Sequence, residues 1–224
     1  MPSVSRWKSD TVSGFLHSAE APPRGALVLT HGAGSNCQSA LLVKVAEHFS
    51  SIGFTVMRCD LSFRQARPYE PPHPSQAARD RQGLSAAVDE IRRIAPGPVI
   101  LGGHSYGGRQ ASILVSEQPG IADALLLLSY PLHPPNKPGQ LRTAHFASVR
   151  IPALFVHGTK DPFGTVDEIR SAINLFTGGA ELSIVAGAGH DLARGSFDVG
   201  KLVIEPITRL AAARLSQATS IREA

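Results

Sequence analysis

The sequence predicts an α/β fold, a mainly parallel and doubly wound sheet whose two faces are both covered by helices. Six apolar runs of strand length recur along the chain, and segments of helical period separate them. The runs are almost continuously apolar rather than alternating, which is typical of parallel strands buried on both faces. With 224 residues, 42% of them hydrophobic, the chain is long enough for one core. We therefore expect a single domain spanning residues 1–224.

The predicted strands follow in chain order. They are Ala26–Thr30, Phe54–Cys59, Pro98–Leu101, Ala124–Leu128, Ala153–Val156 and Glu181–Val185. About 24 residues precede the first of them, which leaves room for one or two leading strands, one of them within Thr11–His17.

Helical periodicity fills the segments between the strands. Apolar residues fall on one helix face over residues 41–49, and Gly53 is placed to end that helix. The same period recurs over residues 84–94, where Pro96 and Gly97 end it. These segments are expected to pack on the faces of the sheet.

Two further helices are expected toward the C-terminus. The run Thr165–Glu168 is a capping box, and it opens a helix whose apolar side is formed by Ile169, Ala172, Ile173 and Phe176. Residues 199–216 also have a helical pattern, in which Pro206 either starts the helix or kinks it.

Charge and composition exclude several function classes. The net charge of +4 is spread along the chain without a run of five or six basic residues, so no nucleic-acid partner is expected. No apolar stretch approaches the ~20 residues that span a bilayer, and the N-terminus lacks the apolar core of a signal peptide, so a cytoplasmic protein without a membrane partner is expected. Cys37 and Cys59 are expected to be reduced, and no metal-ligand spacing is present, so no metal or cofactor is expected.

The residues Gly103-His104-Ser105-Tyr106-Gly107 follow a predicted strand and precede a helical run over residues 109–115. This is the pattern of a nucleophile elbow. A strand that turns into a helix within one residue brings the positions two before and two after the serine together, so both must be glycine. The alternative is a glycine-rich turn that only packs closely or holds a phosphate.

A serine nucleophile needs a base, and the base needs an acidic partner. Asp161 follows the strand that begins at Ala153, and His190 follows the strand that ends at Val185. Because parallel strands end at one edge of the sheet, we expect both side chains near Ser105. Asp161 could instead cap a turn and His190 could be an exposed loop residue; Asp60 and Asp191 are weaker candidates for the acid.

Residues 30–35 form a small-residue loop after the first long strand. A backbone N–H of this loop, with the N–H of Tyr106, would form an oxyanion hole. We favour Ala33 as the first donor, with Gly32 or Gly34 as alternatives.

Contacts with the substrate are expected from residues around this loop and from the loop at residues 60–75. The candidates are His31, Gly32, Arg64 and His104. The loop carries Phe63, Arg64, Arg67, Tyr69 and His73 among prolines and could act as a partial lid. We further expect Arg64, Arg67 or Lys137 to meet an acidic group of the substrate, with solvated surface charge as the alternative.

Taken together, these motifs resemble the α/β-hydrolase superfamily. They are Leu29–Gly34, Gly103–Gly108, Phe155–Gly164 and Gly187–His190, and the resemblance extends from about Gly25 to Leu192. The stretch Tyr130–Pro138 followed by Pro152-Ala-Leu-Phe resembles the small branch related to dienelactone hydrolase, which includes a testis-expressed vertebrate protein and a scaffold subunit of a histone acetyltransferase complex.

The resemblance implies an α/β-hydrolase fold and a serine hydrolase of small esters, lactones or thioesters. Ser105 would be the nucleophile, Asp161 the acid and His190 the base of an acyl-enzyme route. Larger hydrolases insert a helical cap after the strand that corresponds to Ala124–Leu128, but here only residues 130–150 follow it, so no cap domain is expected. The alternative function is a catalytically silent interaction protein on the same fold.

Overall fold

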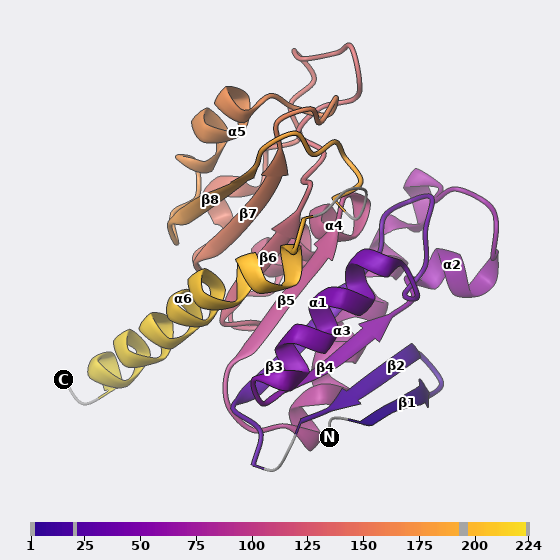
Figure 1. The fold of residues 1–224 in the computed structure, drawn as a ribbon, viewed down its shortest axis with the longest axis vertical. Coiled ribbons are helices and arrows are strands. Elements are labelled where there is room, and N and C mark those ends of the chain that lie inside the picture. Colours follow the sequence, from indigo (N-terminus) through magenta and orange to yellow (C-terminus); the bar gives the residue numbers. More distant parts are fainter. Residues whose placement is uncertain (1–2, 20–21, 193–196, 223–224) are drawn as a thin grey trace.

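The computed structural model describes residues 3–19, 22–192 and 197–222, and its centre is one eight-stranded sheet (Figure 1). The strand order is β1-β2-β4-β3-β5-β6-β7-β8. The pairs β1–β2 and β2–β4 are antiparallel, and the other five pairs are parallel. The predicted class, a mainly parallel α/β fold, is confirmed. The strands are β1 (Ser3–Lys8), β2 (Ser13–Ser18), β3 (Gly25–Thr30), β4 (Phe54–Cys59), β5 (Val99–His104), β6 (Ala124–Leu128), β7 (Ala153–Gly158) and β8 (Ala180–Val185).

All six strands predicted from apolar runs are present, and β4 and β6 have the predicted bounds. Strand β5 runs three residues beyond the predicted end at Leu101, because Gly102, Gly103 and His104 pair with Leu126, Leu127 and Leu128 of β6. Pairing with a neighbouring strand, rather than apolar character, extends the strand here. At the N-terminus two leading strands are present, and β2 covers most of the predicted Thr11–His17 segment.

The helices occupy the predicted intervals, with differences at their ends. They are α1 (Ala40–Ser51), α2 (Ser62–Ala66), α3 (Ala77–Ile94), α4 (Tyr106–Glu117), α5 (Val166–Ile173) and α6 (Val199–Arg222), with 3₁₀ turns η1 (Pro74–Gln76) and η2 (Phe146–Ser148). The capping box at α5 is present: Thr165 Oγ1 accepts from the Glu168 N–H at 3.2 Å, and Glu168 Oε2 accepts from the Thr165 N–H at 2.7 Å. Phe176 was expected on this helix, but it lies beyond the helix end and is buried all the same. Pro206 lies inside α6 and does not start it.

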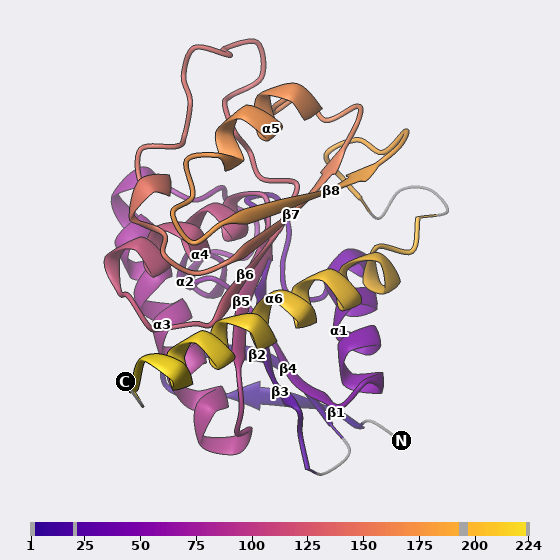
Figure 2. The same ribbon diagram turned by 90° about the vertical axis from the view of Figure 1, so that its left-hand side faces the viewer.

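Helices cover both faces of the sheet, as Figures 1 and 2 show. Leu27 and Leu29 of β3 pack into the apolar cluster that contains residues of α1 and α6. Ala26 and Val28, which point to the opposite face, belong to the cluster that contains residues of α3, α4 and α5. This alternation explains why β3 is buried along its whole length.

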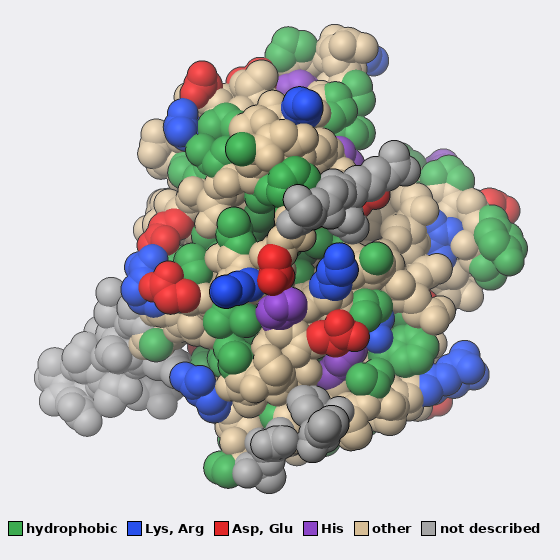
Figure 3. Space-filling view, in the orientation of Figure 1, with side chains coloured by type: hydrophobic (Ala, Val, Ile, Leu, Met, Phe, Trp, Pro, Cys, Tyr) green, Lys and Arg blue, Asp and Glu red, His purple; other side chains and the backbone are tan. Residues whose placement is uncertain are grey.

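Charged side chains of both signs are interspersed on the face shown in Figure 3, and no broad patch of one sign is seen there. Among the helices of the described residues, none combines the length and the apolar character that would let it cross a membrane.

Two features of the fold determine what lies at the carboxyl edge of the parallel strands. The loops after β3, β5, β7 and β8 all open at this edge. Of the described residues between β6 and β7, only 146–148 are helical, so no cap domain covers the edge.

Candidate active site

Ser105 stands between the end of β5 and the start of α4 in a strained conformation. Its φ of 51° and ψ of −117° lie in a region that residues other than glycine rarely adopt. A Cβ at Gly103 would lie 2.8 Å from the Gly107 carbonyl carbon, and one at Gly107 would lie 2.5 Å from the His31 carbonyl oxygen. The turn is therefore as tight as the glycine spacing in the sequence indicates, and the strain raises the serine side chain above the helix N-terminus.

Ser105, His190 and Asp161 lie within hydrogen-bonding distance of one another in series. The Nε2 atom of His190 is 2.8 Å from Ser105 Oγ, and its Nδ1 atom is 2.9 Å and 3.0 Å from the two carboxylate oxygens of Asp161. The three residues follow β5, β8 and β7, three strands that end at one edge. The structure thus brings together side chains that are up to 85 residues apart in sequence.

The partners of the His190 ring assign its tautomer. A carboxylate only accepts, so Nδ1 carries the hydrogen, and Nε2 is left to accept from the serine hydroxyl. The Asp161 side chain has 0% exposure, whereas 21% of the His190 side chain is exposed. Oδ1 of Asp161 also accepts from the backbone N–H of Phe163 at 2.9 Å. A shielded carboxylate held in this way can orient the imidazole and stabilise its charged form.

A second histidine, His157, faces the same carboxylate. Its Nδ1 atom lies 3.8 Å from Asp161 Oδ2, while its Nε2 atom donates to the Gly164 carbonyl oxygen at 2.7 Å. His157 lies within the Phe155–Gly164 motif, and the sequence pattern alone assigns it no role. It bridges the end of β7 to the turn that carries Asp161, so we assign it to positioning that turn.

Buried side chains fix the conformation of the 30–35 loop from the inside of the fold. His31 is fully buried; its Nδ1 donates to the Gly32 carbonyl oxygen at 2.8 Å, and its Nε2 accepts from the Leu61 N–H at 3.1 Å. Burial lowers the pKa of this imidazole, which matches the neutral tautomer that these partners require. His31 was expected to contact the substrate, but the structure places it inside the fold, where it braces the loop.

Arg64 also lies beneath this loop and not beside Ser105. Its Nε donates to the Ser35 carbonyl oxygen at 2.8 Å, its Nη2 to that of Ala33 at 2.7 Å, and its Nη1 to that of Pro68. The side chain is 7% exposed. The expectation that Arg64 meets an acidic substrate group is therefore not supported, because backbone carbonyls already occupy its donors.

The other two basic residues that were expected to meet an acidic substrate group, Arg67 and Lys137, also lie away from Ser105. Arg67 is paired with Glu70 at 2.5 Å and donates to Gln76 at 2.7 Å, and Lys137 is exposed on the loop after β6. Neither lines a hollow at Ser105.

Ser105 lies at the junction of two hollows. The first, which we call the histidine pocket, has a volume of about 480 Å³ and includes Gly32, His104, His190 and Asp191. The second, which we call the arginine pocket, also has a volume of about 480 Å³ and includes Arg81, Arg109 and Arg142. Ala33, Ser105 and Phe163 line both.

Two of the expected substrate contacts, Gly32 and His104, do reach the histidine pocket. A Cβ at Gly32 would lie 3.3 Å from Ser105 Cβ, so glycine keeps the space above the serine open. His104 Nε2 donates to the backbone carbonyl oxygen of His190 at 2.9 Å, and burial lowers the pKa of this ring. A neutral His104 thus also fixes the backbone that carries His190.

Tyr106 is fixed by a buried carboxylate. Its hydroxyl donates to Asp80 Oδ2 at 2.8 Å, and Asp80 Oδ1 accepts from the Phe63 N–H at 2.9 Å. Burial raises the pKa of Asp80. Asp80 thus connects Tyr106, the first residue of α4, to Phe63 of α2.

Residues that the sequence analysis missed include Phe163 and the three arginines. The Phe163 ring lies 4.2 Å from that of His190, centroid to centroid. The position of Phe163 two residues after Asp161 could have indicated that it lies near the site. The position of Arg109 one helical turn after Ser105 could have indicated the same. Arg81 and Arg142 come from α3 and the loop after β6, and nothing local in the sequence connects them with Ser105.

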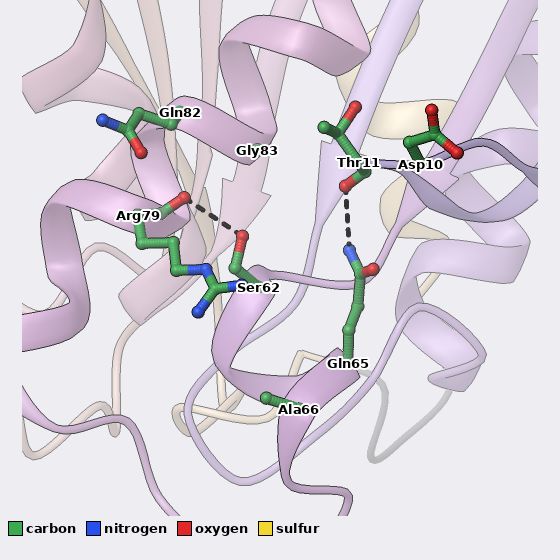
Figure 4. A pocket seen from close by; sticks show the side chains of 8 residues that line it. All are labelled: Asp10, Thr11, Ser62, Gln65, Ala66, Arg79, Gln82 and Gly83. Carbon is green, nitrogen blue, oxygen red and sulfur yellow. Dashed lines mark hydrogen bonds between the residues drawn. The ribbon is translucent and has the colours of Figure 1, made fainter.

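A further hollow, of about 380 Å³, lies apart from Ser105 between the β1–β2 turn, α2 and α3 (Figure 4). Ser62 Oγ donates to the Arg79 carbonyl oxygen at 3.0 Å, and Gln65 Nε2 to that of Thr11 at 3.3 Å. These bonds fasten α2, the helix that carries Arg64. We therefore assign this hollow a structural role.

Comparison with known proteins agrees with this architecture. The family model described as an alpha/beta hydrolase domain matches residues 23–205. Est1E from Butyrivibrio proteoclasticus superposes with a TM-score of 0.71 at 16% identity, covering 95% of this chain and 99% of that one. A dienelactone hydrolase from Anabaena variabilis gives 0.71 at 19% identity, over 90% and 93% of the two chains. A lidless α/β serine hydrolase from Xanthomonas campestris gives 0.69 at 13% identity, over 93% and 94%.

Proposed function

Because this chain belongs to the alpha/beta hydrolase domain family, we propose that it is a serine hydrolase that cleaves a small ester, lactone or thioester through an acyl-enzyme. One observation carries the proposal: His190 Nε2 lies 2.8 Å from Ser105 Oγ, while its Nδ1 faces the shielded carboxylate of Asp161. This is the arrangement that a serine hydroxyl needs to become a nucleophile.

In the first half of the proposed reaction, Ser105 Oγ attacks the acyl carbon and its proton passes to His190 Nε2. Asp161 stabilises the imidazolium that forms. The developing oxyanion accepts from the backbone N–H groups of Ala33 and Tyr106, each worth about 3 kcal/mol of barrier. His190 then protonates the leaving group, and the acyl group stays on Ser105.

In the second half, water attacks the acyl-enzyme. His190 takes the proton of that water and returns it to Ser105 Oγ when the acid product departs. Both halves use the same donors and the same base, so no other group has to supply or remove a proton. The open carboxyl edge, without a cap domain, suits a small substrate.

A fluorophosphonate probe tests the proposal directly, because it reacts only with an activated serine. We expect labelling at neutral pH that Ser105→Ala abolishes and that the exposed-site control Ser5→Ala keeps. A panel of p-nitrophenyl esters of graded acyl length, with one lactone, would then define the substrate range. Absence of labelling and of hydrolysis would refute the proposal and favour a non-catalytic interaction protein on this fold.

A further inference from the structure

The two pockets that meet at Ser105 differ in charge. Among the described residues that line the histidine pocket there is one carboxylate, Asp191, and no lysine or arginine. Among those that line the arginine pocket there are three guanidinium groups and no aspartate or glutamate. Among the described residues, guanidinium groups therefore face a substrate at Ser105 from the arginine pocket and not from the histidine pocket.

The proposed reaction determines which part of the substrate lies in the histidine pocket and which part lies in the arginine pocket. His190 must protonate the leaving group, so the leaving group has to occupy the histidine pocket, which His190 lines. The acyl chain then extends to the other side of Ser105, into the arginine pocket. The positive charge consequently faces the acid part of the ester and not the alcohol part.

The arginine pocket also contains donors that lack a partner within the described part of the chain. Gln110 is fully buried; its Oε1 accepts from Arg81 Nη1 at 3.0 Å, and its Nε2 has no hydrogen-bond partner. Nε of Arg109 is likewise buried and has no partner. An unpaired buried donor is costly, and an incoming acceptor would remove that cost.

Charge compensation in this pocket is incomplete. Arg81 pairs with Glu117 at 2.7 Å, whereas the partner of the Arg142 guanidinium among the described residues is a neutral group, the Pro131 carbonyl oxygen, at 3.2 Å. Burial, and then repulsion from Arg109, lower the pKa of Arg142. A bound anion would relieve this repulsion between the two guanidinium groups.

We propose that the acyl chain of the substrate carries a carboxylate, which Arg109 and Arg142 bind, so that the enzyme hydrolyses half-esters of dicarboxylic acids. The planar fork of arginine matches a carboxylate, and two such groups can hold both of its oxygens. Water adds across the ester bond, and the products are a dicarboxylate and an alcohol. This inference rests on the proposed serine-hydrolase function and names its substrate class.

The kinetic test compares esters matched in acyl length. Monoethyl glutarate carries the carboxylate on the acyl chain, ethyl pentanoate replaces it with a methyl group, and the butanoate ester of glycolic acid carries it on the alcohol. We expect kcat/KM for monoethyl glutarate to exceed that for ethyl pentanoate about 10-fold or more, since charged hydrogen bonds contribute about 1.5–3 kcal/mol. The glycolate ester should gain no such advantage over ethyl butanoate.

Two variants locate the effect. Arg142→Gln and, separately, Arg109→Gln should lower the ratio of kcat/KM for monoethyl glutarate to kcat/KM for ethyl pentanoate about 10-fold. Arg93→Gln, on the exposed side of α3, removes the same charge outside the pocket and should leave the preference intact. Equal losses on both esters, or equal rates on both esters in the unmodified protein, would overturn the inference.

A binding measurement separates this inference from the proposed function. Ser105→Ala, which cannot form the acyl-enzyme, is titrated calorimetrically with monoethyl glutarate. Binding that Arg142→Gln abolishes in this background supports the carboxylate site even if the unmodified protein hydrolyses nothing, in which case only the hydrolase proposal fails. Hydrolysis of neutral esters without such binding refutes the carboxylate site and leaves the hydrolase proposal standing.

Discussion

The guanidinium Nη2 of Arg64 donates to the carbonyl oxygen of Ala33 at 2.7 Å. The same side chain holds the Ser35 carbonyl oxygen at 2.8 Å, so one buried arginine spans the loop that contains the proposed oxyanion donor. The sequence suggested a substrate-binding arginine at this position, whereas the fold has placed its charge under the loop. Arg64 is therefore a positioning residue, and its role can be separated from substrate recognition.

Arg64→Ala should lower kcat for neutral and carboxylate-bearing esters alike. Loss of an oxyanion donor costs about 100- to 1,000-fold in kcat, and a misplaced donor should cost less, about 10-fold or more. KM should change little, because Arg64 does not line either pocket. A rise in KM confined to carboxylate-bearing esters would contradict this and restore the substrate-binding role. Arg67→Ala, whose side chain pairs with Glu70, is the control.

Asp161→Asn should lower kcat by about 10⁴-fold and leave the fold intact. The amide can donate to His190 Nδ1, which favours the tautomer whose Nε2 carries the hydrogen and cannot accept from Ser105. Steady-state kinetics and the rate of fluorophosphonate labelling would both show the loss. Asp191→Asn, the neighbour in sequence of His190, serves as the comparison; an equal loss there would mean that the acid has been assigned to the wrong carboxylate.

Gly107→Ala should destabilise the fold. Its new Cβ would lie 2.5 Å from the His31 carbonyl oxygen and 2.7 Å from Thr30 Cγ2. The first atom belongs to the backbone and the second to a buried residue at the end of β3, so neither can move away easily. Overpacking of this kind costs about 1–3 kcal/mol. Urea unfolding would measure it. Gly139→Ala, where a Cβ meets nothing within 4 Å, should unfold at an unchanged urea midpoint.

Stability should fall as the pH is lowered from about 6.5 to about 4. Burial lowers the pKa of His17 to about 4, and burial followed by Arg109 lowers that of His145 to about 4. Between these pH values each histidine is protonated in the unfolded chain but neutral in the folded chain. Each therefore contributes up to about 1.4 kcal/mol per pH unit to the slope of the free energy of unfolding against pH.

The two histidines can be tested separately by urea unfolding at graded pH. His17→Gln keeps an acceptor for Arg58 Nε, which lies 2.8 Å from His17 Nε2, and should remove the contribution of His17 to the pH dependence of the unfolding free energy. His145→Gln should remove the contribution of His145. A slope that survives both substitutions would show that other groups carry the acid sensitivity.

The order and type of the central elements follow from local chain chemistry. Continuous apolar runs such as Ala124–Leu128 have few alternatives to a buried strand, and Thr165 with Glu168 can satisfy each other only at a helix start. The ends of elements were predicted less well. His104 and Gly158 are in strands because neighbouring strands pair with them, which no feature of their own residue type indicates.

By itself, the sequence determined which side chains stand at the ends of strands. Ser105, Asp161 and His190 were predicted to lie near one another because parallel strands end at one edge, a rule that needs no coordinates. Only the tertiary structure decided what each arginine does. A guanidinium group is long enough to turn toward a backbone carbonyl or toward open space, and the choice depends on packing between distant elements. Arg64 therefore became a brace for the 30–35 loop, whereas Arg81, Arg109 and Arg142, from three separate segments, came to line the same pocket.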